Sequence, residues 1–140
     1  MDKDDLLNQL KNYIYCRLKP SKFGGVGVFA IRKIPAGVEP FLGSAQPKHI
    51  FFSVEQLEDL HPNVKRLVQD IVVYKNGVYH LPDNGLAQID IAYYVNHSDS
   101  PNLKVREDGH TFEAITDILE GEELTADYST YNDEEDVFDR

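Results

Sequence analysis

The chain is poor in the residues on which many metal and thiol sites depend. Its 140 residues include a single cysteine, Cys16, and no tryptophan. One cysteine excludes an intrachain disulfide and a cysteine-based zinc site, because both need several thiols. We therefore expect Cys16 to be a half-buried thiol without a catalytic role, and we predict no metal site.

Long hydrophobic runs are also absent. The first five residues, MDKDD, are acidic and polar, so they do not provide the apolar segment of a signal peptide. No window approaches the roughly 20 apolar residues that a membrane-spanning helix needs. We therefore expect an intracellular protein that does not insert into a membrane.

Positive charge is scarce. The chain has 14 Lys and Arg against 24 Asp and Glu, which gives a net charge of −10. Such a domain repels the phosphates of nucleic acids, so direct nucleic-acid binding is disfavoured. It attracts basic partners, such as lysine-rich protein tails, and speeds their encounter. Negative charge that only aids solubility has the same composition, so charge alone does not separate the two interpretations.

The remaining composition is that of an ordinary globular protein. Hydrophobic residues make up 41% and charged residues 27% of the chain, which favours a folded domain over disorder. A chain of this length forms one domain and can bury a core without crosslinks. We predict a single domain over residues 1–140, with an acidic tail at 132–140 that is mobile unless Val137 and Phe138 dock.

Helical patterns occur in two places. Residues 4–12 predict a short N-terminal helix with Leu6, Leu7 and Leu10 on one face and acidic residues at its start. The second place is residues 53–71, where a Ser-x-x-Gln capping box predicts a helix from Ser53 to about Leu60. Proline at a first helical position predicts another helix over 62–71. Its apolar face should comprise Val64, Leu67, Val68 and Ile71.

The other regular segments are β-like. Asn76-Gly77 lies between two β-rich runs and is a strong signal for a type I′ hairpin. Asp108-Gly109 lies between residues 103–107 and 111–115 and predicts a second hairpin of the same kind. Further strands are predicted at residues 13–19, 28–31 and 124–128.

The chain also contains an internal repeat. Residues 30–39 and 114–123 share Ala-Ile, a second Ile, a Gly and a Glu at the same spacing. Each copy predicts a strand, an apolar anchor, a tight turn and the next strand. Two copies indicate a repeated supersecondary unit and not a solenoid, which needs more repeats.

Three polar segments could carry chemistry, but each is ambiguous alone. Residues 24–27 (GGVG) suit a loop that approaches a ligand, or an ordinary tight turn. They match neither a phosphate-binding nor a dinucleotide-binding loop. Residues 96–102 (NHSDSPN) form a polar loop whose side chains are sequence neighbours, so they cannot converge as a nucleophile and its base. Tyr128 at a strand end is most simply a packing residue.

In combination these segments are specific. The chain has GVGVFA at 25–30, YVNHS at 94–98 followed by Pro101-Asn102, and GEELTADY at 121–128. This ordered set resembles the SET-domain family of protein lysine methyltransferases. The resemblance covers about residues 15–131 and is to a small, single-domain member without the Cys-rich cap of many relatives. The helical stretch at 53–71 lies where the family has a variable insert.

The resemblance implies a mainly β, α+β fold. The family has short curved sheets and few helices. Its C-terminal segment threads through a loop to form a pseudoknot, which brings the Asn-His segment beside the last strand. The internal repeat resembles the β duplication of the family.

The resemblance also implies an activity and a cofactor, S-adenosylmethionine. Gly25, Val26 and Gly27 would offer backbone groups to it, while Asn96 and His97 would hold its methionine and adenine portions. The target lysine would enter from the opposite face through a narrow aromatic channel. The expected reaction is methyl transfer to the side-chain amine of lysine in a basic protein, such as a histone or ribosomal protein.

The resemblance assigns the tyrosines as follows. Tyr128 would be the active-site tyrosine beside the transferred methyl, and Tyr94 would line the substrate channel. Tyr93 replaces an Arg of the family at the cofactor side, which would alter contacts to the cofactor carboxylate. Ala126 replaces an aromatic residue of the channel wall, and Tyr131 is expected to fill that gap.

The missing cap and these departures leave alternatives open. The lysine channel could be open, closed by Phe138, or completed by a second subunit in a homodimer. Tyr93, Ala126 and the missing cap also fit a second hypothesis, a catalytically inactive SET-fold module that binds proteins. The sequence does not identify the target lysine or the number of methyl groups added.

Overall fold

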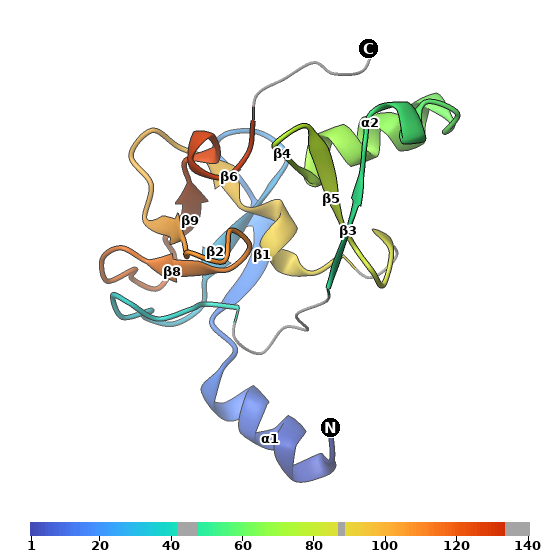
Figure 1. Cartoon of the computed structure of the whole chain (residues 1–140). Helices are drawn as coiled ribbons and strands as arrows, with labels where there is room; N and C mark the ends of the chain where they lie inside the picture. The colour runs from blue at the N-terminus through green and yellow to red at the C-terminus, as the bar shows by residue number, and fades with distance from the viewer. Residues whose placement is uncertain (42–47, 87–88, 134–140) are drawn as a thin grey trace.

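The computed structural model describes residues 1–41, 48–86 and 89–133, and most of its regular elements are strands (Figure 1). A six-stranded sheet has the order β1-β2-β9-β7-β8, with β6 paired to β9, and a three-stranded sheet has the order β3-β5-β4. The strands of the larger sheet are β1 (Cys16–Pro20), β2 (Val26–Ala30), β6 (Asn96–His97), β7 (Leu103–Val105), β8 (Phe112–Ala114) and β9 (Glu123–Ala126). Those of the smaller sheet are β3 (His49–Phe52), β4 (Val73–Lys75) and β5 (Val78–Pro82). The predicted α+β class is confirmed.

Strand β9 organises the larger sheet. It pairs antiparallel with β2 and parallel with both β6 and β7. In the β6 register, Asn96 lies opposite Thr125 and His97 opposite Ala126. The Asn-His segment therefore lies beside the last strand, as the expected topology requires. Fully buried side chains pack around this strand, among them Val28 and Leu124, both with 0% exposure.

The internal repeat is confirmed, because its two copies pair with each other. Ile34 and Ile118 form an antiparallel bridge in which each N–H donates to the other's carbonyl at 2.8 Å. Both side chains are completely buried. Two further bonds of 2.8 Å join the copies in the same reciprocal way, from Gly37 N–H to Ala114 O and from Gly121 N–H to Ala30 O.

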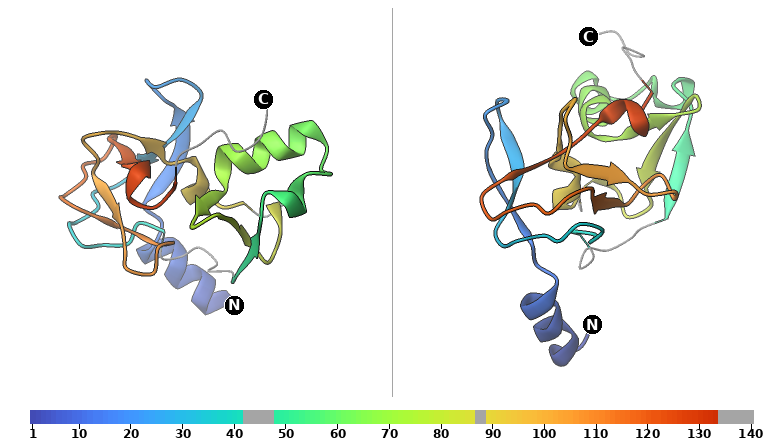
Figure 2. Two further views of the ribbon diagram at one scale, coloured as in Figure 1. Left: turned by 45° about the horizontal axis from the view of Figure 1, so that its top comes forward. Right: turned by 90° about the vertical axis from the view of Figure 1, so that its left-hand side faces the viewer.

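The insert forms a small unit beside the larger sheet (Figure 2). It combines the three-stranded sheet with helix α2 (Pro62–Ile71), whose bounds are those predicted from Pro62. Its separate core contains Leu57, Val68, Val72 and Tyr79. The predicted apolar face of α2 is only partly correct, because Val68 is buried while Val64 and Leu67 are 40% and 42% exposed. A three-stranded sheet is narrow and covers one stripe of the helix.

The capping box at Ser53 forms, but the helix predicted from it does not. The Ser53 N–H donates to Gln56 Oε1 at 2.9 Å, and the Gln56 N–H donates to Ser53 Oγ at 3.3 Å. Only the short 3₁₀ helix η1 (Glu55–Leu57) follows. A capping box satisfies the first donors of a helix, but it does not supply the packing that extends one.

The N-terminal helix α1 (Lys3–Asn12) begins at a capping box of Asp2 and Asp5 and projects away from the body (Figure 1). The leucines on its predicted apolar face are 46–59% exposed, namely Leu6, Leu7 and Leu10. No helix in the described ranges is long and apolar enough to cross a membrane.

One of the two predicted type I′ hairpins is correct. Residues 76–77 have φ of 55° and 80°, as that turn requires. At the second hairpin only Gly109 has a positive φ, and its N–H donates to Arg106 O at 2.9 Å, so the type I′ prediction is wrong. The Asp108 carboxylate accepts hydrogen bonds from the backbone N–H and the hydroxyl of Thr111, which holds Asp108 in another conformation.

The end of the described chain attaches to the insert. The Tyr74 N–H donates to Asn132 Oδ1 at 2.7 Å, and the Asp133 N–H donates to Tyr74 O at 2.6 Å. The first two residues of the predicted mobile tail are therefore part of the fold. Val137 and Phe138 lie outside the described residues.

Asn102 joins the loop after β6 to strand β9. Its side-chain amide donates to Glu123 O and its Oδ1 accepts from the Thr125 N–H, both at 2.8 Å. Asn102→Ala should lower the free energy of unfolding by about 2–3 kcal/mol, because two partly buried backbone groups lose their partners. Urea denaturation measures this loss. Asn12→Ala on the exposed α1 is the control and should change stability by less than about 0.5 kcal/mol; equal changes would contradict the assignment.

Candidate functional site

The glycine-rich loop leaves its backbone uncovered. Its ends are closed by two hydrogen bonds, from the Ser21 N–H to Gly25 O at 3.0 Å and from the Gly24 N–H to Ser21 O at 3.1 Å. Gly24 and Gly25 have φ of +96° and +61°, and no heavy atom lies within 4 Å of a Cβ built on either. These peptide groups can therefore approach a ligand closely, as predicted for Gly25.

A carboxylate connects this loop to the Asn-His segment. Glu123 accepts hydrogen bonds from Ser21 Oγ at 2.8 and 3.0 Å and from Asn96 Nδ2 at 2.8 Å. Asn96 Nδ2 also donates to Val26 O at 3.1 Å. Gly27 borders the carboxylate so closely that a Cβ there would lie 2.2 Å from Glu123 Oε2. Glu123 therefore holds together the segments that contain Val26, Gly27 and Asn96. The sequence places it in the repeat and in the last motif but indicates no role for it in the site.

His97 has partners on both ring nitrogens. Its Nδ1 accepts from the Tyr128 N–H at 3.1 Å, and its Nε2 lies 3.0 Å from Asp99 Oδ1. The Tyr128 bond requires an unprotonated Nδ1, so Nε2 carries the proton and donates to Asp99. This arrangement supports a positioning role for His97. In the described part of the chain, no three His, Cys, Asp or Glu residues are arranged to hold a metal ion.

Tyr128 opens the 3₁₀ helix η4 (Tyr128–Thr130) and does not end strand β9 as predicted. The Asp127 carboxylate caps η4 by accepting from the Ser129 N–H. The Tyr128 hydroxyl donates to the backbone oxygen of Val95. Burial, with a smaller contribution from Glu123, raises the pKa of Tyr128 above its ordinary value, so the phenol is protonated at neutral pH.

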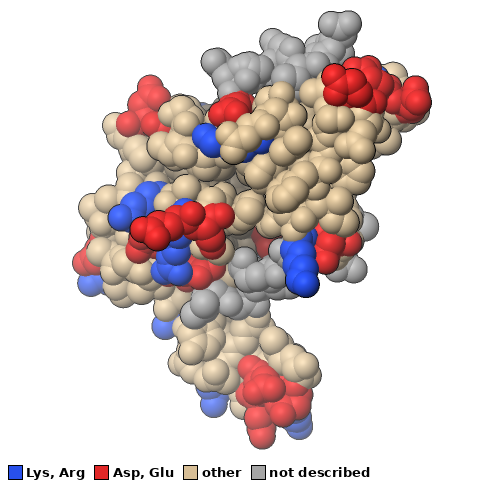
Figure 3. Space-filling view, viewed as in Figure 1, with Lys and Arg blue, Asp and Glu red and all other residues tan. Residues whose placement is uncertain are grey.

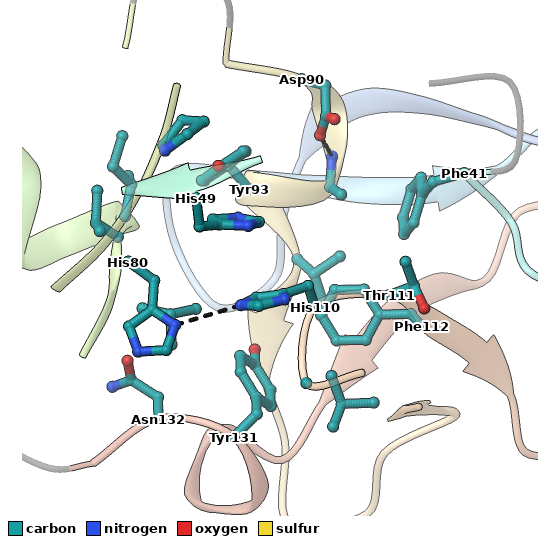
Figure 4. Close-up of a pocket in the computed structure, with 18 of the residues that line it drawn as sticks. Phe41, His49, His80, Asp90, Tyr93, His110, Thr111, Phe112, Tyr131 and Asn132 are labelled. Atoms are coloured by element: carbon teal, nitrogen blue, oxygen red, sulfur yellow. Dashed lines mark hydrogen bonds between the residues drawn. The ribbon is translucent and has the colours of Figure 1, made fainter. Parts of the chain in front are cut away.

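Tyr128 also lines a cavity of about 360 Å³. The cavity lies between the insert and the larger sheet (Figure 4). Tyr128, Tyr131 and Phe112 form an aromatic part of its lining. The Tyr131 ring lies 5.9 Å from that of Tyr128 and 5.5 Å from that of Phe112, between ring centroids. Burial raises the pKa of Tyr131 well above its ordinary value. This aromatic part of the wall is therefore uncharged at neutral pH.

The two neighbouring tyrosines of helix η3 (Ile91–Tyr94) point to different surroundings. Tyr93, assigned above to the cofactor, lines the cavity, and burial and then Asp90 raise its pKa. Tyr94, assigned above to the substrate, is 37% exposed and is not among the described residues of the cavity wall. Ala126, at the position where a gap in that wall is expected, is 1% exposed, packs in the core and is not among the described residues of the cavity wall.

Cys16 is half-buried, as expected. Burial raises the pKa of its thiol to about 12. The reactive thiolate is therefore scarce at neutral pH, which supports a structural role.

Other residues of the cavity had no signal in the sequence. Asp90 caps η3 by accepting from the Ala92 N–H at 2.9 Å. Three others are histidines on separate elements, namely His49, His80 and His110. Their spacings of 31 and 30 residues match no motif, so only the folded chain brings them together.

Comparisons with known proteins agree with this geometry. The SET domain family profile matches residues 25–129. A candidate histone methyltransferase of Plasmodium falciparum has a TM-score of 0.54 at 20% identity, with 82% of this chain and 93% of that chain covered. A humanized mutant of Chaetomium thermophilum Polycomb Repressive Complex 2, bound to an inhibitor, has a TM-score of 0.56 at 20% identity, with 94% of this chain and 18% of that chain covered.

At this identity the two structures establish the shared fold and nothing finer. None of the curated proteins matches the chain by sequence. The family profile, in contrast, covers most of the chain and includes the glycine-rich loop, the Asn-His segment and Tyr128. The protein belongs to the SET domain family.

Proposed function

We propose that this protein transfers a methyl group from S-adenosylmethionine to the side-chain amine of a lysine in a basic protein. The observation that carries the proposal is the position of Tyr128. Its N–H donates to His97, the neighbour of Asn96 in the Asn-His segment, its hydroxyl donates to Val95 O, and its side chain lines the cavity. One residue thus joins a candidate cofactor site to a candidate substrate site.

The residues around the glycine-rich loop fit the cofactor. Gly25 and Val26 would offer backbone groups, while Asn96 and His97 would hold the polar ends. The uncovered backbone at Gly24 and Gly25 gives a ligand close access, and the nearby Glu123 carboxylate suits a cationic one. When bound, the cofactor supplies an electrophilic methyl group on a positively charged sulfur.

The cavity residues prepare the amine. A free lysine has a pKa of about 10.4, and only its neutral amine is a nucleophile. The aromatic wall formed by Tyr128, Tyr131 and Phe112 removes water from an entering ammonium group, which lowers its pKa. Val95 O and the Tyr128 hydroxyl can hold a methyl group through weak C–H···O contacts and align it with the amine.

Two measurements test the proposal. Calorimetry measures binding of S-adenosylmethionine, and labelled methyl transfer to lysine-rich proteins measures turnover. We expect both, with the label on lysine by mass spectrometry. Binding without turnover would instead support the inactive protein-binding module, which Tyr93 and the missing cap first suggested. Absence of binding would overturn both functions.

We further propose a lysine-rich substrate, as a histone tail or a ribosomal protein would provide. Three carboxylates, Glu39, Asp70 and Asp90, line the cavity, and its described lining includes no Lys or Arg. The net charge of −10 acts in the same direction over longer distances. Acidic side chains also gather on α1 at the bottom of the face in Figure 3. The carboxylates of the cavity and the negative charge of the whole chain both favour a cationic partner over an anionic one.

Salt should weaken recognition of that partner. The KM for a lysine-rich substrate should rise several-fold between about 50 and 300 mM salt, because screening shortens the range of attraction, while kcat stays nearly constant. Steady-state kinetics measure both constants. A peptide with the same target lysine and neutral flanks is the control and should respond less. A KM that does not depend on salt would contradict the charge argument.

A further inference from the structure

Three histidines meet where the insert faces the larger sheet (Figure 4). His49 lies on β3, His80 on β5, and His110 in the turn between β7 and β8. The rings of His49 and His110 are stacked, with centroids 4.0 Å apart and planes at 13°. His80 Nδ1 lies 3.3 Å from His110 Nε2. We call these residues the histidine cluster.

The hydrogen bonds of the histidine cluster require a neutral His80 ring. His80 Nε2 lies 3.4 Å from Lys75 O, which can only accept, so Nε2 is the donor. His80 Nδ1 is then unprotonated and accepts from the Nε2–H of His110. A second proton on His80 would point an N–H at the N–H of His110. Protonation of His80 would therefore replace this hydrogen bond with a repulsive contact.

The histidine cluster joins two units that have separate hydrophobic cores. One core centres on Val28, Ile34 and Leu124, and the other on Val68 and Tyr79 in the insert. On the β4 side, the insert is attached through the hydrogen bonds to residues 132–133. On the β3 and β5 side, the histidine cluster bridges to the β7–β8 turn, and the cavity borders both attachments.

The surroundings of the histidine cluster both lower and raise the pKa values of His49 and His110. Burial lowers the pKa of His49 and of His110, and the neighbouring imidazoles lower both further. Asp108 raises both pKa values, and Asp83 raises that of His49, but neither reverses the direction. The other charged groups that line the cavity are Glu39, which is paired with Arg106 at 3.1 Å, Asp70 and Asp90.

These lowered pKa values determine the pH range. A free imidazole titrates near 6.5, and burial together with the neighbouring imidazoles makes His49 and His110 bind protons more weakly. The closed arrangement therefore has its full stability above pH 6.5 and loses it as the pH falls through the lowered values. Protonated His49 and His110 would then carry like charges on stacked rings whose centroids are 4.0 Å apart.

We propose that the histidine cluster is a pH-sensitive latch, which holds the insert against the β7–β8 turn at neutral pH and releases it at mildly acidic pH. Release loosens the wall of the cavity and places positive charge where a cationic lysine would enter. The latch itself depends only on the fold. Its effect on substrate rests on the proposed function.

Hydrogen exchange tests the latch without any substrate. Between pH 7 and 5.5, the protection factors of the β3 and β5 amides should fall by about tenfold or more. The reason is that uptake of one proton on opening changes the opening equilibrium by up to about tenfold per pH unit. His110→Phe keeps an aromatic ring but cannot take up the proton, so its protection should depend much less on pH. His80→Asn is a second variant in case the first fails to fold. All buffers contain a chelator to exclude stray metal ions.

The matched control is His61→Asn. His61 caps α2 in the insert by accepting from the Asn63 N–H, and Asn is an equally good cap. This variant should keep the full pH response. Protection of β3 and β5 that does not change with pH in the wild type, or that changes equally in His110→Phe, would overturn the latch.

The effect on substrate needs a second measurement. The KM for a lysine-rich substrate should rise by about fivefold or more from pH 7 to 5.5 beyond the change seen in His110→Phe, while cofactor affinity changes little. A protein that fails to transfer methyl groups would refute the proposed function, and hydrogen exchange would still decide the latch. Equal KM profiles in wild type and His110→Phe would show that the histidine cluster does not control substrate access.

Discussion

Replacing Tyr128 with Phe should lower the rate of methyl transfer by about 10²–10³-fold, the loss typical for one preorganised polar group at a reacting centre. The phenol is protonated at neutral pH and donates to Val95 O. Its removal leaves that carbonyl unpaired and takes away one of the two oxygens proposed to hold the methyl group. Cofactor affinity should stay within about twofold, because His97 binds the backbone N–H of residue 128, which Phe retains.

Labelled methyl transfer at saturating substrate measures the rate for Tyr128→Phe, and calorimetry measures its affinity for the cofactor. Tyr13→Phe is the matched control, since Tyr13 is 37% exposed at the end of α1 and loses the same hydroxyl. Its activity should equal that of the wild type. Equal activity of Tyr128→Phe and the wild type would show that the hydroxyl has no role in the reaction.

Gly27→Ala should weaken cofactor binding by roughly 10–100-fold. The new Cβ would lie 2.2 Å from Glu123 Oε2 and 2.8 Å from its Cδ, so the carboxylate must move. Movement breaks its hydrogen bonds to Ser21 and Asn96, and bonds to charged groups contribute about 1.5–3 kcal/mol each. The glycine-rich loop and the Asn-His segment then lose their common anchor.

A double-mutant cycle separates this mechanism from a direct effect on the loop. In the Glu123→Ala background the added methyl group meets no carboxylate, and its remaining near contact is Asn96 Nδ2 at 3.0 Å. Asn96 no longer has its bond to Glu123 there and can shift, so Gly27→Ala should cause a much smaller further loss of affinity. Calorimetry of cofactor binding to the wild type, the two single variants and the double variant gives the coupling free energy between residues 27 and 123. If Gly27→Ala lowers cofactor affinity equally in both backgrounds, Gly27 acts through its own backbone and not through Glu123.

Several local features were predictable because short-range chemistry determines them. Asn76 and Gly77 both adopt positive φ, which these residue types tolerate best. Pro62 begins α2 where a missing N–H costs nothing. The repeat at 30–39 and 114–123 was visible as spacing, and its copies pair through backbone bonds that follow from that spacing.

Other local signals were overridden by their surroundings. The box at Ser53 forms its hydrogen bonds but produces only a three-residue 3₁₀ helix. At Asp108 the side chain accepts from the backbone N–H of residues 110 and 111, and this competes with the type I′ turn. In both cases a local preference was correctly identified, and further contacts decided the conformation.

The sequence by itself determined the family and indicated the segments of the candidate site, because three ordered motifs with their spacing are a property of the chain alone. Only the tertiary structure decided which side chains meet. Glu123 reaches Asn96 because β6 and β9 pair in parallel, and Tyr93 lines the cavity in place of Tyr94 because of the way η3 packs. The histidine cluster has the same origin, since its members come from β3, β5 and the β7–β8 turn. Such contacts depend on the packing of elements that are distant in sequence, and no local pattern records that packing.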